Sequence, residues 1–147
     1  MVESYNPDSV WPPFGAFSML TLEGDGQIVH LKGQVSLDRD GHIVGKNDMA
    51  VQVRQTLQNI ESVLAAMGGR MSDILSLTHY ATDIEAFMAT AAIRRKFFSA
   101  PYPATTTVEV ARLFDVSLVI EITAIAEIPR DRFRRPGPPA SSAAAGI

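Results

Sequence analysis

Apolar and polar residues alternate in the last third of the chain, a pattern that is typical of β-strands. In the segment 102–128, YPATTTVEVARLFDVSLVIEITAIAEI, the even-numbered positions from Val116 to Ala126 are apolar and the odd-numbered positions are mixed. Because side chains alternate between the two faces of a strand, this pattern predicts one apolar face and one mixed face. Glu121 lies on the mixed face, and a carboxylate in so apolar a run is costly unless it meets water, a partner or a ligand. Glu121 is therefore the first candidate functional residue.

The same segment also predicts an earlier strand, over 105–110, with Thr105, Thr107 and Glu109 on one face. We expect this strand to lie beside the strand that carries Glu121, because the connection between them is short. Further strands are predicted over 17–23, 27–35 and 74–82. The first two of these are expected to form a hairpin that turns at Gly24-Asp25-Gly26.

Apolar residues at three- and four-residue spacing predict two amphipathic helices. The first begins at Asn47 or Asp48, either of which can cap it, and runs to about Met67, where glycines end it. The second is capped by Asp83 and runs through Phe98. Three cations lie near its C-terminal end, where they suit the helix dipole: Arg94, Arg95 and Lys96.

This order of elements predicts an α+β fold, in which a mixed sheet carries both helices on one face. The other face is expected to hold a mixed set of side chains: His30, Lys32, Gln34, Thr78, Tyr80, Thr105, Thr107, Glu109, Glu121 and Thr123, with Val119 and Ile125. Tyr80, Val119 and Ile125 would serve as apolar anchors. We therefore expect this face to be an interface between subunits.

The length of 147 residues is that of one domain, which we place at 1–128. Residues 1–14 are expected to form an irregular arm, pinned to the body by Trp11 and Phe14. The Pro, Gly, Ser and Ala bias of 129–147 predicts a disordered tail.

Charge and composition narrow the classes of function. The net charge of −3 argues against a general nucleic-acid or membrane-surface binder, and the absence of cysteine excludes disulfides and thiolate chemistry. The N-terminus does not resemble a signal peptide and no apolar run is long enough to span a bilayer, so a cytoplasmic protein is the default expectation.

No metal site is expected, because His30, His42 and His79 are scattered singly along the chain. His79 falls on an apolar strand face and is interpreted as a core histidine, whereas His30 keeps a chance of a functional role. The run Asp38-Arg39-Asp40 is better explained by turn chemistry than by calcium ligation.

Several motifs together resemble the RidA/YjgF family. The segments PATTTVEVARL and LVIEITAIAEI are similar to that family's C-terminal signature, which reads close to PARSCVEVARL and then IEIEAIA. Upstream, Gly33-Gln34-Val35 and the helix VQVRQTLQNIESVLAAMG resemble further family motifs. The resemblance spans roughly residues 15–128 in the right order.

The resemblance implies a chorismate-mutase-like subunit in a homotrimer with a central barrel, and ligand sites in clefts between subunits. It also implies hydrolysis of reactive enamines and imines to keto acids and ammonia, without a cofactor. In that scheme an arginine binds the substrate carboxylate and a glutamate activates the attacking water.

On this resemblance Glu121 matches the family's catalytic glutamate and Gly33 its backbone site glycine. Four other site positions differ from the family: Thr105 replaces the carboxylate-binding arginine, Thr107 a cysteine, Phe17 a tyrosine and Ala91 an asparagine. Threonine cannot supply the arginine's charge, so a small 2-aminoacrylate-type substrate is not expected. The departures favour a bulkier or neutral ligand.

Lys32, next to Gly33, offers a cation that could compensate or pair with Glu121; the alternative is a structural contact with solvent or another carboxylate. Two functions stay open: a cofactor-free enamine or imine deaminase, or a non-catalytic homotrimer that binds a metabolite or a partner. Ribonuclease activity is also attached to the family by name, but the sequence does not contain the basic and aromatic surface that RNA binding needs.

Overall fold

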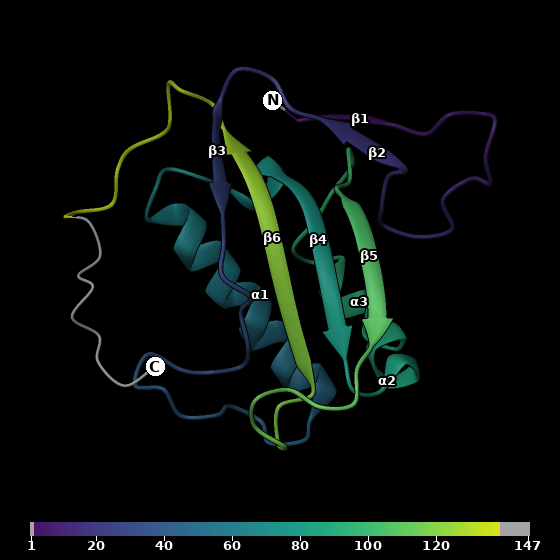
Figure 1. The fold of residues 1–147 in the computed structure, drawn as a ribbon, viewed down its shortest axis with the longest axis vertical. Coiled ribbons are helices and arrows are strands. Elements are labelled where there is room, and N and C mark those ends of the chain that lie inside the picture. The colour runs from purple at the N-terminus through teal and green to yellow at the C-terminus, as the bar shows by residue number, and fades with distance from the viewer. Residues whose placement is uncertain (1, 139–147) are drawn as a thin grey trace.

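Four strands form the main sheet, in the order β3-β6-β4-β5 (Figure 1). The computed structural model describes residues 2–138. The strands span Gln27–His30 (β3), Ile74–Ala81 (β4), Ala104–Glu109 (β5) and Ile120–Ile128 (β6). β6 is antiparallel to both β3 and β4, whereas β5 is parallel to β4. The predicted α+β class with a mixed sheet is confirmed.

β4 lies between β5 and β6, so the expectation that the last two strands would be neighbours is wrong. β4 and β5 run parallel, and parallel strands need a crossover, which the helical segment between them provides. β5 therefore occupies the outer edge of β4, and the connection 110–119 carries the chain past β4 to β6.

The hairpin predicted at Gly24–Gly26 is also wrong. β2 (Leu20–Leu22) pairs with β1 (Glu3–Tyr5) in a separate small sheet, while β3 pairs with β6. The arm predicted over 1–14 thus begins with a strand. Two side-chain hydrogen bonds of 2.9 Å hold the small sheet in place: Ser4 Oγ donates to the carbonyl of Tyr102, just before β5, and Thr21 Oγ1 donates to the carbonyl of Leu75 in β4.

The first predicted helix is confirmed as α1 (Met49–Ala65). The Asp48 carboxylate caps it by accepting a hydrogen bond from the Val51 amide at 3.1 Å. Gly68 follows the helix with a φ of 79°, in the left-handed region that glycine adopts without strain.

The second predicted helix is broken into α2 (Ile84–Met88) and α3 (Ala91–Arg94). Its Asp83 cap is confirmed, since that carboxylate accepts from the Ala86 amide at 3.0 Å. The break falls at Thr90, whose Oγ1 donates to the Phe87 carbonyl at 2.6 Å. A threonine hydroxyl that bonds the preceding turn competes with helix continuation, which explains why one long helix does not form.

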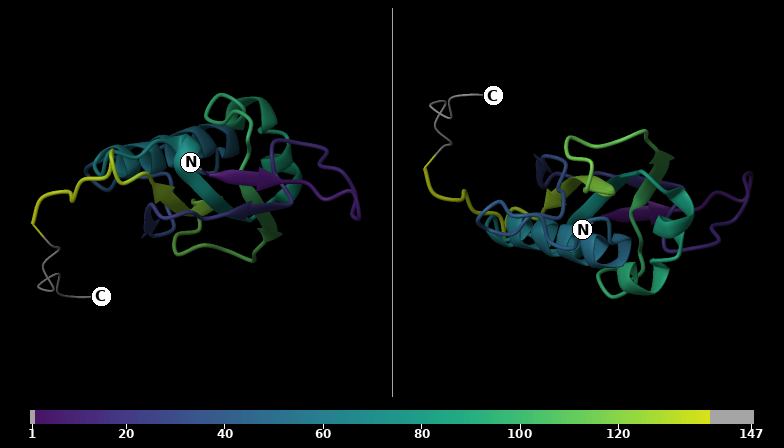
Figure 2. Two further views of the ribbon diagram at one scale, coloured as in Figure 1. Left: turned by 90° about the horizontal axis from the view of Figure 1, so that it is seen from above. Right: turned by 90° about the horizontal axis from the view of Figure 1, so that it is seen from below.

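The helices lie on one face of the main sheet, as the edge-on views show (Figure 2). The core between the layers is built mainly of apolar residues from α1, β4 and β6, together with Phe87 of α2: Val53, Leu57, Ile60, Leu64, Ile74, Leu77, Ala81, Ile120, Ile122, Ala124 and Ala126. The alternation predicted for β6 is thereby confirmed up to Ala126, and that of β4 is confirmed from Ser76 on. A register shift between Ile74 and Ser76 places Ile74, instead of Leu75, in this core. A short 3-10 helix, Met71–Asp73, leads into β4.

The face of β5 was predicted wrongly. Thr105 pairs with Leu77 and Thr107 with His79, so both threonines lie on the helix-covered face. Glu109 is on that face too, because its carboxylate accepts from the Ile84 amide at the start of α2 at 3.0 Å. The open face of β5 carries the intervening residues instead.

The pairing of the 27–35 segment with β6 slips by one residue. His30 lies opposite Ile125, and an uninterrupted ladder would place Gln34 opposite Glu121; Gln34 instead lies opposite Ile122. A shift of one residue exchanges the two faces of a strand. Consequently Gly33, rather than Lys32 or Gln34, lies against Glu121 from this segment.

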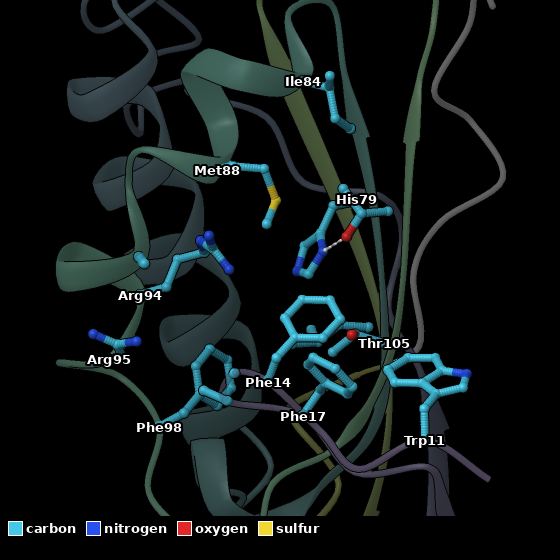
Figure 3. Close-up of a pocket in the computed structure, with 15 residues that line it drawn as sticks. Trp11, Phe14, Phe17, His79, Ile84, Met88, Arg94, Arg95, Phe98 and Thr105 are labelled. Carbon is cyan, nitrogen blue, oxygen red and sulfur yellow. Dashed lines mark hydrogen bonds between the residues drawn. The ribbon is translucent and has the colours of Figure 1, made fainter.

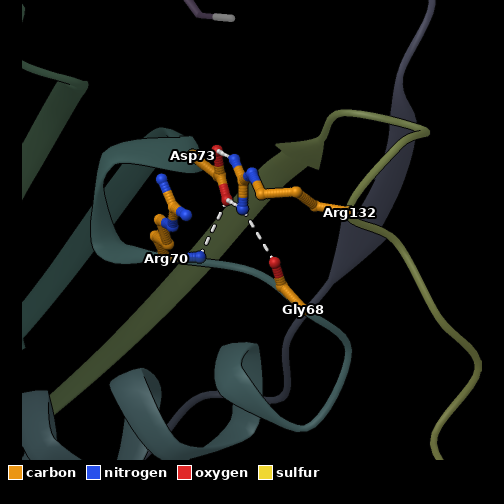
Figure 4. Close-up of polar contacts among 4 residues, drawn as sticks. All are labelled: Gly68, Arg70, Asp73 and Arg132. Atoms are coloured by element: carbon orange, nitrogen blue, oxygen red, sulfur yellow. Dashed lines mark hydrogen bonds and ion pairs between the residues drawn. The ribbon is translucent and has the colours of Figure 1, made fainter.

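The segment after β6 is partly fixed. Arg132 forms two hydrogen bonds to the Asp73 carboxylate, at 2.6 and 3.0 Å, and one to the Gly68 carbonyl at 2.7 Å (Figure 4). The Arg134 amide donates to the Met67 carbonyl at 3.0 Å. The predicted tail therefore begins with a stretch that packs on the end of α1, and its residues 139–147 lie outside the described range.

Candidate functional site

A cavity of about 410 Å³ opens between the helix-covered face of the sheet, the α2–α3 segment and the N-terminal loop (Figure 3). We call it the aromatic cavity. Its lining residues come from all three parts: Trp11, Phe14, Gly15, Ala16, Phe17, Leu77, His79, Ile84, Met88, Ala91, Arg94, Arg95, Phe98, Thr105 and Thr107. This volume is within the range of small-molecule sites.

Three aromatic rings from the loop between β1 and β2 form one wall. Trp11 stacks on Phe14 with ring centroids 5.6 Å apart, and Phe14 meets Phe17 edge-on at 5.1 Å. Trp11 and Phe14 are nevertheless 58% and 76% exposed. They contact one another and Phe17 at the cavity rather than anchor the arm in the core, and they present a flat apolar surface to a ligand.

A histidine and a threonine form a polar pair in the same cavity. His79 Nδ1 and Thr107 Oγ1 are 2.9 Å apart, on paired positions of β4 and β5. Burial, together with the charge of Arg94, lowers the pKa of His79 to about 3. The imidazole is therefore neutral near pH 7, and its ring lies 4.8 Å from that of Phe87. The interpretation of His79 as a buried histidine is correct, but it borders a cavity.

Arg94 brings a charge to the cavity. Its guanidinium lies 4.4 Å above the Phe87 ring, and its Nε donates to Thr90 Oγ1 at 3.2 Å. The side chain is half-buried, and burial followed by the nearby charge of Arg95 lowers its pKa. Both arginines border the cavity, whereas the sequence assigned them only to the helix dipole.

A second cavity, of about 260 Å³, lies on the open face of the sheet and contains Glu121. We call it the glutamate cavity. Its lining residues are Gly33, Tyr80, Val110, Arg112, Leu113, Glu121 and Thr123. A Cβ on Gly33 would come within 2.2 Å of Glu121 Oε2, so any larger residue here would displace the glutamate carboxylate. The glutamate carboxylate therefore rests directly against the Gly33 backbone.

The predicted site residues divide between the two cavities. Thr105, Thr107, Phe17 and Ala91 line the aromatic cavity, whereas Glu121 and Gly33 line the other. On β4, Leu77 pairs with Thr105 and Tyr80 with Glu121, and odd and even positions point to opposite faces. The sheet itself thus separates Glu121 from Thr105 within one chain.

Lys32 borders neither cavity and is exposed. Within residues 2–138 the ion pairs are His42–Asp38 and Arg132–Asp73, so Lys32 and Glu121 are not paired in this chain. Within one chain Lys32 therefore lies outside both cavities, while its pairing with Glu121 across a subunit interface stays a prediction. The cations that line the same cavity as Thr105 are Arg94 and Arg95.

The sequence contains a helical spacing that indicates Arg94. Phe87, Ala91 and Arg94 follow one another at four- and three-residue spacing, which places them on one side of a helical segment. Ala91 was already a candidate, so its neighbour one turn on was accessible to the same reasoning. The cavity role of His79 depended on the pairing of β4 with β5, which the sequence alone did not predict.

Three exposed side chains approach one another in the turn 38–42, which the scattered histidines of the sequence did not indicate. Ligand atoms of Asp38, Asp40 and His42 lie within 4.8 Å of one another. Asp38 Oδ1 accepts hydrogen bonds from the Asp40 and His42 amides, both at 2.9 Å. These bonds, that from His42 first, lower the pKa of Asp38. The predicted turn chemistry accounts for this cluster.

None of the helices within residues 2–138 has the length and apolar character needed to cross a membrane.

Comparison with known proteins agrees with the motifs and the fold. Residues 11–128 match the family model described as Endoribonuclease L-PSP. A 2-iminobutanoate/2-iminopropanoate deaminase of Salmonella typhimurium is 35% identical over 104 residues, which cover 68% of this chain and 80% of the relative. A RutC family protein of Pyrococcus horikoshii is 35% identical over 115 residues, covering 78% and 88%. The crystal structure of the Rid family protein YyfB from Yersinia pestis has a TM-score of 0.78 at 29% identity, covering 86% of this chain and 98% of that one. The chain therefore belongs to the RidA/YjgF family.

Proposed function

We propose that this protein is a cofactor-free hydrolase of an enamine or imine, acting in a cleft between subunits of a homotrimer. One observation carries the proposal: Glu121 and Thr105 lie on opposite faces of one sheet, so a single chain cannot bring them together. A second copy whose open sheet face packs near the aromatic cavity of the first would bring a glutamate cavity to it. The deaminase relative supports the reaction class.

In this mechanism Glu121 accepts a proton from water, which adds to the imine carbon to form a carbinolamine. That proton passes to the nitrogen, the carbinolamine hydroxyl then gives its own proton to the departing nitrogen by way of Glu121, and the carbon–nitrogen bond breaks as the carbonyl forms and ammonia leaves. The sum is one imine and one water giving one carbonyl compound and one ammonia. Thr105, Thr107 and nearby backbone N–H groups would orient the substrate from the other subunit.

The size and lining of the aromatic cavity favour a substrate larger than 2-aminoacrylate. Its volume of about 410 Å³ and its aromatic wall suit an apolar side chain. The net charge of −3 does not favour the endoribonuclease activity named in the family model's description.

The test is ammonia release from imines generated in place by an amino-acid oxidase, with aliphatic and aromatic amino acids. We expect acceleration over the spontaneous rate, and Glu121→Gln should lower kcat by about 10²- to 10⁴-fold because it removes the base. Glu61→Gln, on the exposed side of α1, is the matched control and should leave kcat unchanged.

If the protein accelerates ammonia release from none of these imines, the proposal is overturned. If the same compounds or their keto-acid products still raised the melting temperature, the alternative of a non-catalytic, metabolite-binding homotrimer would be favoured. Full activity of Glu121→Gln would remove this residue from the mechanism.

A further inference from the structure

The Arg94 charge has no protein counterion in the described part of the chain. Its printed contacts are the Phe87 ring, the Thr90 hydroxyl and, at 3.5 Å, the Phe87 carbonyl. The two ion pairs within residues 2–138 involve other side chains. A half-buried guanidinium without a carboxylate is held at a cost in free energy, and a bound anion would offset that cost.

All charged side chains that line the aromatic cavity are positive. Two arginines line it and none of its lining residues is an aspartate or glutamate, although the chain as a whole has a net charge of −3. His79 adds no positive charge near pH 7, since its pKa is about 3. A cavity in which every charged lining residue is a cation favours anionic ligands.

The position of Arg94 within the cavity defines the shape of the ligand. Its side chain extends from α3 toward His79, while Phe14 and Phe17 lie on the other side of the same space (Figure 3). An anionic group at Arg94 therefore leaves the rest of the ligand against aromatic rings. The guanidinium has five N–H donors and uses two nitrogens on Thr90 and Phe87, so donors remain for an oxyanion.

We infer that Arg94 is the anion-binding residue of this protein and that the ligand is a carboxylate with a large, flat apolar group, such as an aromatic imino or keto acid. This inference rests on the proposed function in one respect, because it identifies the anion as the carboxylate of the substrate. Arg94 thus takes the role that Thr105 cannot perform, from a helical segment instead of from β5.

The experiment measures binding, which needs no turnover. The probes are 3-phenylpropanoate and its neutral isostere 3-phenylpropanamide, titrated calorimetrically into the full-length protein. We expect the carboxylate to bind about tenfold more tightly than the amide. Arg94→Met should abolish this preference and leave the amide affinity unchanged, which also shows that the cavity is intact. Arg94→Lys should retain part of the preference, because it keeps the charge but not the planar fork.

Lys96→Met is the matched control, since Lys96 is a cation two residues further along the chain, exposed and outside the cavity lining. It should keep most of the preference. Equal affinity of the wild type for both probes, or a preference that survives Arg94→Met, would overturn the inference.

Different results would contradict this inference and the proposed function. An Arg94-dependent carboxylate preference in a protein without hydrolase activity would sustain this inference and contradict the proposed function. If the protein hydrolyses aromatic imino acids and Arg94→Met leaves their KM values unchanged, the proposed function is sustained and this inference is contradicted.

Discussion

The residue at position 105 borders the aromatic cavity, where we propose that a carboxylate binds. The family signature has an arginine there, and this chain has Thr105, on the face of β5 that borders the cavity. The short hydroxyl side chain leaves volume that an arginine would fill. The substitution thus enlarges the cavity and removes a charge, while Arg94 supplies one from α3.

Restoring the arginine should change the preferred substrate. In Thr105→Arg the guanidinium would bind a small carboxylate through two parallel hydrogen bonds, so kcat/KM for 2-iminopropanoate should rise about tenfold or more. For an aromatic imino acid it should fall, because the new side chain occupies the space of the ring. Thr105→Lys, with the charge but not the fork, is the control, and an equal gain in both variants would contradict the geometric reason.

His79 should make the protein sensitive to acid. Because burial and Arg94 depress its folded pKa to about 3 from the usual 6.5, the unfolded state binds the proton first. Its contribution to stability is full above about pH 6.5 and is lost as pH falls toward 3. Over that window the wild type should lose on the order of 4 kcal/mol more than His79→Gln, in urea unfolding as a function of pH.

The control for this experiment is His42→Gln, on a turn with a side chain that is 80% exposed. It should follow the wild-type curve. Parallel curves for the wild type and His79→Gln would mean that the buried imidazole does not contribute to acid unfolding.

At the scale of elements, the segment 129–134 behaves as part of the domain. Asp73 is only 4% exposed, and its carboxylate accepts hydrogen bonds from the Arg132 guanidinium and the Arg70 amide. Arg132→Met would leave this carboxylate with its backbone partner alone. We expect a loss of about 2 kcal/mol in the free energy of unfolding, measured by denaturant titration.

Arg130→Met is the matched control for that variant. The Arg130 guanidinium is exposed and donates to the Asp25 carbonyl at 2.7 Å, with no carboxylate partner in the described range. The loss should stay within about 0.5 kcal/mol. Similar losses in the two variants would show that the Arg132–Asp73 pair does not fix the segment.

The elements themselves were largely predictable, and their partners were not. α1, β4 and β6 carry strong periodic patterns that local chemistry decides, including the Asp48 cap and Gly68. Which strand pairs with which depends on nonlocal contacts: β2 resembles half of a hairpin, yet it pairs with β1. The wrong face for Thr105 followed from assuming that β5 and β6 were neighbours, because the register against β4 sets that face.

The candidate site was predictable to the same degree. Motif matching found Glu121, Gly33 and Phe17, each of which borders a cavity. It missed Arg94 and the cavity position of His79, because only the packing of α3 and the pairing of β4 with β5 bring these side chains to the cavity. Lys32 was selected by sequence proximity to Gly33, and the one-residue slip in pairing removed it from the cavity.

At the scale of the whole molecule, the open sheet face is the surface on which the proposed trimer depends. Val108, on the open face of β5, is 38% exposed, and Val63, on α1, is 37% exposed, so Val63 serves as a control for a substitution at Val108. Val108 lies beside Tyr80, which in turn pairs with Glu121. An arginine at Val108 should break the interface, because a charge in an apolar contact is costly.

Sedimentation should therefore show a trimer for the wild type and for Val63→Arg, and monomers for Val108→Arg. Imine hydrolysis should disappear together with the trimer. A monomeric wild type, or a monomeric variant with full activity, would contradict the proposal that two subunits form the cleft.

The pairing of β1 with β2 has a consequence for binding thermodynamics. The loop with Trp11, Phe14 and Phe17 is closed at its base by that small sheet, and the Ser18 amide fixes its end by donating to the Pro103 carbonyl at 2.9 Å. The aromatic wall is thus preorganised, so a ligand does not have to order it. Loss of the first five residues would leave the main sheet intact and still weaken ligand binding, because the conformational entropy of the freed loop would then oppose association.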